Sequence, residues 1–557
     1  MTASTAPVSP PKRPLSLALL QADSIFWLYA TIALLAAIHI SMVTGRSINW
    51  DEFWFYSQVQ TVARGEFIQP LQTIHTRFFF WLPGLPGNEV DHVLIARVVM
   101  LACLAITSLG IFLIAERFSD KRTAMLAVAA YLGAGFVMQH GASFRVDPIV
   151  TSLLTAGLAI TARTRLTLPA ILGLGMVIGL AGMVTIKFVL WAPAFAGLAL
   201  IRWQDENWDW RYVARWLAAG AVSFGVFGML YILHGTAAAS EEANEIATGI
   251  LERTSGKMFG FFNSPHLYMA GKGALTALPL VLALALVPST IARIKATWQR
   301  KLAWGLMWFP ILTPLFYLNS LPYFYAFILP PVVVTTVITI PIFVKRYGQH
   351  VLAGSIAASA AMIWLVDVRG VTLQQHALID GVHETFEEPV AYIDCCGMIG
   401  SFKKVNEFRT EWGVEKYLRT GRPVILEAIQ ERPVPLLLDN NREFSAAIFG
   451  VNQTTFHPED TEAIRETYVR FWGDIFLAGR VVEADTSMDW QVLVPGTYTV
   501  RGTLVVDGTR YADGDLISLE RGTVRLSNPF SQDARILWGD NLSPPSHEAP
   551  ISYWTTW

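Results

Sequence analysis

The sequence is poor in charged residues and in cysteine. Only 15% of its 557 residues are charged, whereas 53% are hydrophobic and the mean hydropathy is +0.41. The net charge of −2 excludes the generally basic surface of a protein that coats nucleic acid. The three cysteines cannot form a disulfide framework, and we expect buried, inert thiols at Cys103, Cys395 and Cys396. This composition predicts a protein with many membrane helices.

Three further features are absent from the sequence. It has no glycine-rich loop that would cradle a nucleotide phosphate, and no internal repeat of the kind that many transporters carry. Residues 1–22 have no small-residue cleavage site like that of a removable signal peptide. Because this segment contains several prolines and two basic residues, we expect a disordered cytoplasmic tail.

Eleven apolar runs in the sequence have about the length of membrane helices. Lysine and arginine gather in alternate connections between them, which the positive-inside rule places in the cytoplasm together with the N-terminus. The sequence therefore predicts about eleven membrane helices, and the odd number places the chain after about residue 367 outside. The predicted spans are roughly 25–43, 93–115, 123–139, 147–162, 167–183, 187–201, 213–233, 271–291, 302–318, 322–344 and 350–366.

The fold class predicted is a polytopic α-helical membrane protein with a soluble C-terminal region. The expected membrane domain covers 23–366, and an α/β region over 367–480 precedes a β-sandwich over 481–557. The sandwich prediction of five to seven strands rests on a period-two pattern with turns at Asp507-Gly508 and Asp513-Gly514. We favour a structural cap or an acceptor-positioning module for this part over a carbohydrate-binding domain. Its large aromatic residues could stack on sugars, but in a small sandwich such residues more often belong to the core. These residues are Trp490, Tyr498, Tyr511 and Trp538.

Two adjacent carboxylates, Asp51 and Glu52, follow the first apolar run. They lie where a membrane helix leaves the hydrocarbon, among aromatic residues that favour the interface. In the simpler interpretation, Asp51 caps a short helix. In the functional interpretation, Asp51 is a general base and Glu52 orients it or binds an acceptor, with Tyr56 on the acceptor side.

Three more ionisable residues adjoin later apolar runs on the same predicted outer face. Asp147 precedes Pro148 at a helix start, so capping can explain it, but the positive-inside rule gives no reason for Arg145. Lys187 is the only charged residue between 166 and 201. Because a lone lysine deep in a membrane span costs roughly 2.5–3.5 kcal/mol, it should lie near a helix break and face a partner. It is either a snorkelling lysine at a helix end or an anchor for a phosphate.

Together these groups match what transfer of a sugar from a lipid phosphate requires. The acceptor hydroxyl needs a base, and the phosphate leaving group needs cations. Asp51 would be the base, and Lys187 and Arg145, with Arg77 and His75, would hold the phosphate. Asp147 would be a second carboxylate near the acceptor.

At these residues the chain resembles the GT-C glycosyltransferases that use polyprenyl-phosphate sugars, in particular the protein O-mannosyltransferases and the lipid A aminoarabinose transferases. The resemblance covers about 20–345 and implies an isoprenoid-phosphate donor, inversion at the anomeric carbon and a first-loop aspartate as base. Some relatives use a divalent ion near the aspartates, but no ligand set in the sequence predicts one. The motifs are Trp50-Asp51-Glu52, Arg145-Val146-Asp147, the run from Gly179 to Gly182 before Lys187, and the aromatic-then-proline stretch 321–331.

The sequence departs from the family in two places. His75-Thr76-Arg77-Phe78 stands where the family often has a basic residue followed by prolines. The C-terminal region does not match the MIR repeats of the eukaryotic mannosyltransferases, so a protein acceptor gains no support.

The sequence thus predicts a multi-pass protein of the bacterial inner membrane that glycosylates a lipid, glycan or protein at the periplasmic face and has no nucleic-acid partner. Sequons at Asn452 and Asn541 leave an origin in the endoplasmic reticulum open. Two other functions remain as alternatives: a transporter or flippase, and a non-catalytic envelope assembly factor.

Overall fold

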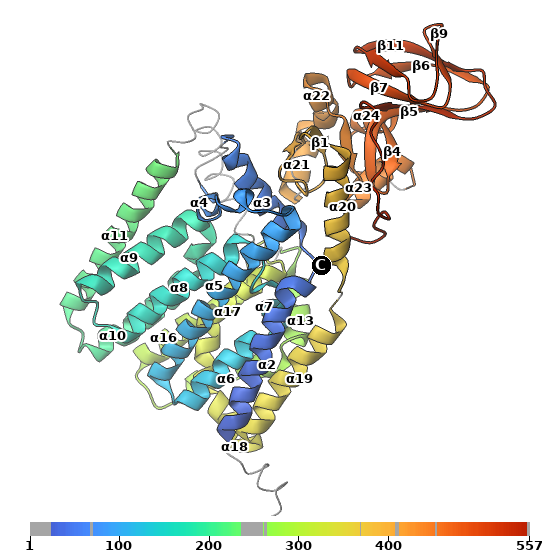
Figure 1. Ribbon diagram of the computed structural model, residues 1–557. Helices are drawn as coiled ribbons and strands as arrows, with labels where there is room; N and C mark the ends of the chain where they lie inside the picture. Colours follow the sequence, from blue (N-terminus) through green and yellow to red (C-terminus); the bar gives the residue numbers. More distant parts are fainter. Residues whose placement is uncertain are drawn as a thin grey trace, which may run out of the picture.

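The molecule has two parts, a bundle of helices and a C-terminal domain of strands and short helices at one end of it (Figure 1). We call this end of the bundle the domain end. The predicted tail over 1–22 and the sequon at Asn452 lie outside the part that the computed structural model describes. The described residues are 24–66, 71–235, 260, 264–367, 369–406, 411–451 and 454–553.

The bundle has helical structure within each of the eleven predicted spans. Its first half contains α2 (Ser24–Gly45), α3 (Trp50–Ala63), α4 (His75–Phe78), α5 (Glu89–Phe118), α6 (Lys121–Leu132), α7 (Gly135–His140), α8 (Val146–Arg163), α9 (Leu168–Val184), the 3₁₀ helix η2 (Ile186–Trp191) and α10 (Ala192–Asp205). Its second half contains α11 (Trp210–Gly235), α13 (Leu267–Leu275), α14 (Leu278–Ala285), α15 (Val287–Arg293), α16 (Trp298–Trp308), η3 (Phe309–Leu315), α17 (Pro322–Val334), η4 (Thr335–Ile338), α18 (Ile340–Tyr347) and α19 (Gln349–Val366).

Several predicted spans are broken rather than continuous. The helix pair over 267–293 bends by 110°, and the pair over 322–347 bends by 54°. Prolines at or near the starts of α14, η3, α17 and α18 account for such breaks, because proline cannot donate the helical hydrogen bond. Within the described residues, five helices are long and apolar enough to cross a membrane, or up to seven if each bent pair counts as one span. The total of eleven stays a prediction.

Small residues allow two helices of the bundle to approach closely. A Cβ atom added to Gly175 of α9 would lie 2.5 Å from the side chain of Val222 in α11, and one added to Gly179 would lie 2.6 Å from the carbonyl oxygen of Ser223. These distances are too short for any larger side chain, which is the small-residue packing typical of membrane helices. The glycine-rich run before Lys187 therefore has a packing role.

The C-terminal domain begins with α20 (Val371–Thr385) and contains two sheets. One sheet has the order β10-β7-β12-β5-β3-β1-β2, with β4 also paired to β5, and the other has the order β6-β11-β8-β9. The elements are β1 (Ala391–Ile393), β2 (Lys403–Lys404), α21 (Glu411–Thr420), α22 (Val424–Glu431), β3 (Leu436–Leu438), α23 (Arg442–Phe449), α24 (Pro458–Thr467), β4 (Tyr468–Trp472), β5 (Ile475–Val482), β6 (Thr486–Val492), β7 (Gly496–Arg501), β8 (Leu504–Val506), β9 (Thr509–Tyr511), β10 (Leu516–Leu519), β11 (Gly522–Asn528) and β12 (Ala534–Trp538).

A single sheet joins the two regions that the sequence suggested for this domain. The expected boundary at residue 480 falls inside β5, which pairs with β3 through 475–477 and with β12 through 479–482. Beyond the parallel pairs of β1 with β2 and β3, the strand pairs are antiparallel. Asp507 and Gly508 form the two-residue turn between β8 and β9 with φ of 47° and 83°, as a tight hairpin favours.

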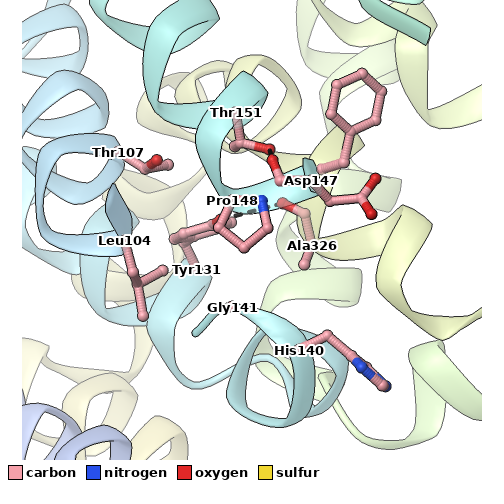
Figure 2. A pocket seen from close by; sticks show the side chains of 10 residues that line it. Leu104, Thr107, Tyr131, His140, Gly141, Asp147, Pro148, Thr151 and Ala326 are labelled. Carbon is pink, nitrogen blue, oxygen red and sulfur yellow. Dashed lines mark hydrogen bonds between the residues drawn. The ribbon is translucent and has the colours of Figure 1, made fainter. Parts of the chain in front are cut away.

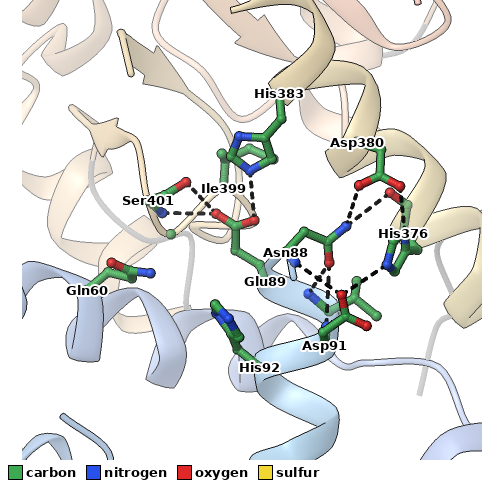
Figure 3. A network of polar contacts seen from close by, with 12 residues as sticks. Gln60, Asn88, Glu89, Asp91, His92, His376, Asp380, His383, Ile399 and Ser401 are labelled. Atoms are coloured by element: carbon green, nitrogen blue, oxygen red, sulfur yellow. Dashed lines mark hydrogen bonds and ion pairs between the residues drawn. The ribbon is translucent and has the colours of Figure 1, made fainter. Parts of the chain in front are cut away.

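Polar contacts fasten the C-terminal domain to the bundle (Figure 3). Glu89, at the start of α5, pairs with His383 of α20 at 3.1 Å and accepts hydrogen bonds from the backbone and hydroxyl of Ser401 at 3.0 and 2.6 Å. His376 lies between Asp91 of α5 and Asp380 of α20, at 3.2 and 2.6 Å. The domain is therefore anchored next to the first connection of the bundle.

Candidate active site

Four charged side chains form a continuous chain of ion pairs at the domain end. Arg145 donates from Nη1 to the carboxylate of Asp51 and from Nε to that of Asp147, the latter at 3.3 Å. Lys187 donates from Nζ to the other oxygen of Asp147. We call Asp51, Arg145, Asp147 and Lys187 the ion-pair chain. The structure thus brings together the four residues that the sequence placed on one face.

The local fold of α3 leaves the carboxylate of Asp51 available to Arg145. Asn49 is the N-cap of this helix, and its side chain accepts from the backbone nitrogen of Asp51 at 3.0 Å. Glu52 completes a capping box by accepting from the backbone nitrogen of Asn49 at 3.1 Å. Asn49 therefore does the capping that the simpler interpretation gave to Asp51.

The start of α8 presents Arg145 and Asp147 to the other charges. Arg145 occupies the N-cap position without a side-chain capping bond, and Asp147 lies in the first turn. A carboxylate in a first turn is favoured by the helix dipole. Because both oxygens of Asp147 accept from cations, its side chain serves the ion-pair chain rather than a cap.

Lys187 lies at a break between two helices. Helix α9 ends at Val184, Thr185 is extended, and the hydroxyl of Thr185 accepts from the backbone nitrogen of Lys187 at 3.4 Å at the start of η2. The break turns the lysine toward Asp147, the kind of partner that a lone charge in an apolar stretch requires.

Aromatic rings flank the two cations. The Cζ atom of Arg145 lies 3.5 Å from the ring centroid of Tyr323 and 5.7 Å from that of Phe55. The Nζ atom of Lys187 lies 5.3 Å from the ring of Tyr323 and 5.8 Å from that of Phe327. Tyr323 and Phe327 belong to α17, so the aromatic stretch of the late helix forms one wall of the site through cation–π contacts.

The ion-pair chain is buried in its middle and more open at its two ends. The side chains of Arg145 and Asp147 are 5% and 3% exposed, whereas those of Asp51 and Lys187 are 17% and 12% exposed. Burial lowers the pKa of Arg145, but the nearby Asp51 and Asp147 outweigh this effect and raise the pKa above its ordinary value. Two carboxylates and two cations leave the chain neutral, which makes their burial tolerable.

Glu52 lies beside the ion-pair chain but faces another partner. Its two carboxylate oxygens accept from Arg97 of α5 at 2.7 and 2.8 Å, and one also accepts from the backbone nitrogen of Phe144 at 2.7 Å. Arg97 was not singled out in the sequence, although it is a lone charge within an apolar run, the same signal that identified Lys187. In the described structure, Glu52 connects α3, α5 and the segment just before Arg145.

His75 and Arg77 lie near the ion-pair chain without being part of it. His75 contacts the ring of Phe55, with centroids 5.1 Å apart, and the Cζ atom of Arg145 lies 5.7 Å from the same ring. Burial lowers the pKa of His75 to about 4, which leaves it uncharged at neutral pH. Arg77 donates from Nε to His234 of α11 at 3.2 Å. The phosphate-binding role expected for these two residues has no support in their positions.

Tyr56 points toward the C-terminal domain rather than toward the site. Its hydroxyl lies 2.5 Å from Nδ1 of His92 and accepts from Gln60 at 2.6 Å. Its ring lies against Gly400, where an added Cβ atom would be 3.1 Å from it. These contacts indicate a packing role, in contrast to the place at the acceptor that the sequence suggested.

A small pocket inside the bundle borders Asp147 (Figure 2). Polar side chains of four helices line it: Thr107 of α5, Tyr131 of α6, His140 of α7 and Thr151 of α8. The hydroxyl of Thr151 donates to the carbonyl of Asp147 at 2.6 Å, and that of Tyr131 donates to the carbonyl of Ala326 at 3.1 Å. The remaining lining is apolar and includes Leu104 and Phe327, so the buried side of the ion-pair chain has a mixed environment.

The described residues offer no metal site. Among them, no three His, Cys, Asp or Glu side chains are grouped in a way that could hold a metal ion. Both aspartates of the ion-pair chain are already neutralised by Arg145 and Lys187. The site therefore consists of two carboxylates and two cations that neutralise one another.

The fold of the chain is similar to that of ArnT from Cupriavidus metallidurans. ArnT bound to undecaprenyl phosphate aligns with a TM-score of 0.55 at 12% identity, over 77% of this chain and 96% of ArnT. ArnT in the apo state aligns with a TM-score of 0.50 at 11% identity, over 76% and 95% of the two chains. An oligosaccharyltransferase from Archaeoglobus fulgidus aligns with a TM-score of 0.46 at 10% identity, over 80% and 73%. No family model and no curated protein matches the sequence.

Proposed function

We propose, from the GT-C fold that this chain shares with ArnT, that it is a membrane glycosyltransferase. It would move a sugar from a polyprenyl-phosphate donor to a hydroxyl group of a lipid, glycan or protein. The observation that carries the proposal is the ion-pair chain, which combines a partly exposed carboxylate with two cations at one end of an apolar bundle. The undecaprenyl phosphate bound to ArnT supports the same class of donor for this chain.

In the proposed reaction, Asp51 at one end of the ion-pair chain acts on the acceptor, and Lys187 at the other end acts with Arg145 on the leaving phosphate. The acceptor oxygen attacks the anomeric carbon of the sugar, and its proton passes to the carboxylate of Asp51. The bond between that carbon and the phosphate oxygen breaks, so that polyprenyl phosphate leaves with one more negative charge. Attack opposite the leaving group inverts the anomeric carbon. Lys187 and Arg145 would stabilise the charge as it develops on the phosphate.

Asp147 has a supporting role in this proposal. It accepts from both cations and holds their nitrogens near one another, with Tyr323 as a neighbouring wall. A phosphate that meets the two cations therefore finds them already oriented, and less reorganisation is required during the reaction. Because the donor carries a lipid, the site would open at the membrane surface, on the periplasmic side according to the positive-inside rule.

The test is sugar transfer by the full-length protein in lipid nanodiscs, with a panel of polyprenyl-phosphate sugars and envelope lipids as substrates. Asp51→Asn keeps the shape of the side chain and removes the base, so we expect kcat to fall about 10²–10⁴-fold. Asp489→Asn is the matched control, because Asp489 lies on β6 of the C-terminal domain and its side chain is 64% exposed. Equal turnover by Asp51→Asn and by the unmodified protein would remove Asp51 from the mechanism.

A further inference from the structure

We propose that the C-terminal domain is a working part of this active site, and that Gln375 is a positioning residue for Asp51. Gln375 lies on α20, whereas Asp51 lies on α3 of the bundle. The inference rests on the proposed function, because it assigns a role in the same reaction to a residue of the other part of the molecule.

The side chain of Gln375 makes a two-way hydrogen-bonded contact with the backbone of Ile48. Its Nε2 donates to the carbonyl oxygen of Ile48 at 2.8 Å, and the backbone nitrogen of Ile48 donates to its Oε1 at 2.9 Å. Both residues are buried, with exposed fractions of 0% and 2%. The amide thus satisfies both polar groups of one peptide residue, in the way that a neighbouring β-strand would.

The position of Ile48 in the sequence makes this contact relevant to the site. Ile48 immediately precedes Asn49, the N-cap of α3, and Asp51 is the second residue of that helix. An N-cap residue decides where a helix begins and in which direction its first turn points. By fixing the peptide of Ile48, Gln375 fixes the first turn of α3 and with it the carboxylate of Asp51.

Other contacts of the domain hold the same segment. The hydroxyl of Thr372 donates to the carbonyl of Arg46 at 3.0 Å, and Arg46 forms a backbone bridge with Arg369. Trp50, directly before Asp51, packs against a core cluster of the C-terminal domain. The domain therefore contacts the chain on both sides of Asn49.

The bundle holds this segment from the opposite side. Arg97 of α5 donates to the carbonyls of Val43, Arg46 and Ser47 at 2.9, 2.9 and 2.8 Å. The carbonyl of Arg46 thus accepts from Arg97 of the bundle and from Thr372 of the domain. The segment before Asp51 is therefore held between α5 and α20. The bundle and the C-terminal domain each supply the contacts on one side of it.

We therefore expect the rate of sugar transfer to fall when the contacts between the C-terminal domain and the segment before Asp51 are weakened. A general base must meet the acceptor hydroxyl at hydrogen-bond distance, and a misplacement of about 1 Å can cost about 10²-fold in rate. Binding of the donor phosphate depends instead on Lys187 and Arg145, which Gln375 does not contact. The expected signature is a lower kcat with little change in the KM for the donor.

The experiment compares three variants of Gln375 with a neighbouring control in the full-length protein. Gln375→Met keeps the size of the side chain but can form neither hydrogen bond. Gln375→Glu keeps the hydrogen-bond acceptor and loses the donor. Gln375→Ala loses both hydrogen bonds and leaves a void in the packing. Gln374→Ala is the control, because Gln374 is the partly exposed preceding residue of α20. We measure kcat and KM for the donor, and in parallel the hydrogen exchange of the peptide covering 46–53.

We expect Gln375→Met to lower kcat about tenfold or more, with the donor KM within about twofold and faster exchange over 46–53. Gln375→Glu should lower kcat at least as much as Gln375→Met, because its buried carboxylate would face the carbonyl oxygen of Ile48. Gln374→Ala should match the unmodified protein. If packing alone mattered, Gln375→Met would behave normally and only Gln375→Ala would be impaired, which would overturn the inference. Unchanged exchange over 46–53, or faster exchange with an unchanged kcat, would overturn it as well.

The two proposals fail in different ways. An unmodified protein that transfers no sugar from any donor would contradict the proposed function and this inference with it. Transfer that is lost in Asp51→Asn but normal in Gln375→Met would leave the proposed function intact and contradict only the positioning role.

Discussion

At the scale of single residues, Arg145 and Lys187 share the carboxylate of Asp147, so the loss of Lys187 should affect both stability and catalysis. Lys187→Met removes one of the two cations on a buried carboxylate, while Arg145 still neutralises it. We expect a loss of stability of up to about 3 kcal/mol. Because Lys187 is also proposed to stabilise the leaving phosphate, kcat should fall about 10²–10³-fold.

A second substitution separates the two effects. Lys187→Met with Asp147→Asn removes the lysine together with the charge that it neutralises, so thermal stability should recover in part. Transfer should stay low, because the phosphate still lacks its cation. Thermal unfolding and turnover are measured on the same samples. Recovery of both together would show that Lys187 serves only the fold.

The sequence allowed the prediction of some site residues because a charge in an apolar run requires a partner. This argument applies to Lys187, and the structure provides Asp147 as its partner. It applies equally to Arg97, but only the fold reveals that Glu52 is the carboxylate involved. The low pKa of His75 could not be predicted, because it depends on burial that no motif records.

At the scale of elements, the docking of α20 on the start of α5 should depend on pH. Burial lowers the pKa of His383, but its hydrogen bond to Glu89 and the charges of Glu89 and Asp380 outweigh this, so the pKa is raised above 6.5. The ion pair between His383 and Glu89 therefore stabilises the docking of α20 fully below pH 6.5, as long as Glu89 is ionised. This stabilisation is lost as the pH rises through the raised pKa of His383. Hydrogen exchange of α20 should therefore become faster, relative to the intrinsic rate, as the pH rises above 6.5 and through the raised pKa.

His383→Gln provides the control for this prediction. The variant cannot gain or lose a charge at this position, so the part of the pH dependence that arises from Glu89 and His383 should disappear. The same pH dependence in His383→Gln and in the unmodified protein would assign the effect to other groups.

The positions of the helices could be predicted from the apolar runs, but their interruptions could not. The predicted span 123–139 is divided into α6 and α7 around Gly133, and Gly135 at the start of α7 donates to the carbonyl of Thr276 at 3.1 Å. This partner is distant in the sequence, and hydrophobicity contains no information about it. The break before Lys187 is different, because a lone lysine indicated it in advance.

At the scale of the whole molecule, the chain shares its fold with ArnT, and a helical bundle followed by a strand-rich C-terminal domain agrees with the general fold class that the sequence predicted. The continuous sheet of the C-terminal domain was not predicted, because β5 pairs with two strands that are distant in the sequence, β3 and β12. The contact between Gln375 and Ile48 joins residues from the two parts of the molecule. Sequence patterns predict the structure of one segment at a time, whereas the shared sheet and the contact between Gln375 and Ile48 depend on how distant segments pack together.

The predicted orientation can be tested because the two ends of the bundle are far apart. Helix α5 has 30 residues and so spans about 45 Å, from Glu89 at the domain end to Phe118 at the other end. If the positive-inside rule holds, the domain end and the ion-pair chain face the periplasm, whereas Lys121 at the start of α6 faces the cytoplasm.

A membrane-impermeant maleimide on intact bacterial spheroplasts should therefore label Thr509→Cys in the exposed β8–β9 hairpin, and should label Lys121→Cys only after permeabilisation. Since Cys395 and Cys396 are buried and Cys103 is partly buried, the unmodified protein gives the background signal. The reverse pattern would place the site in the cytoplasm and would require a donor whose sugar lies on that side of the membrane.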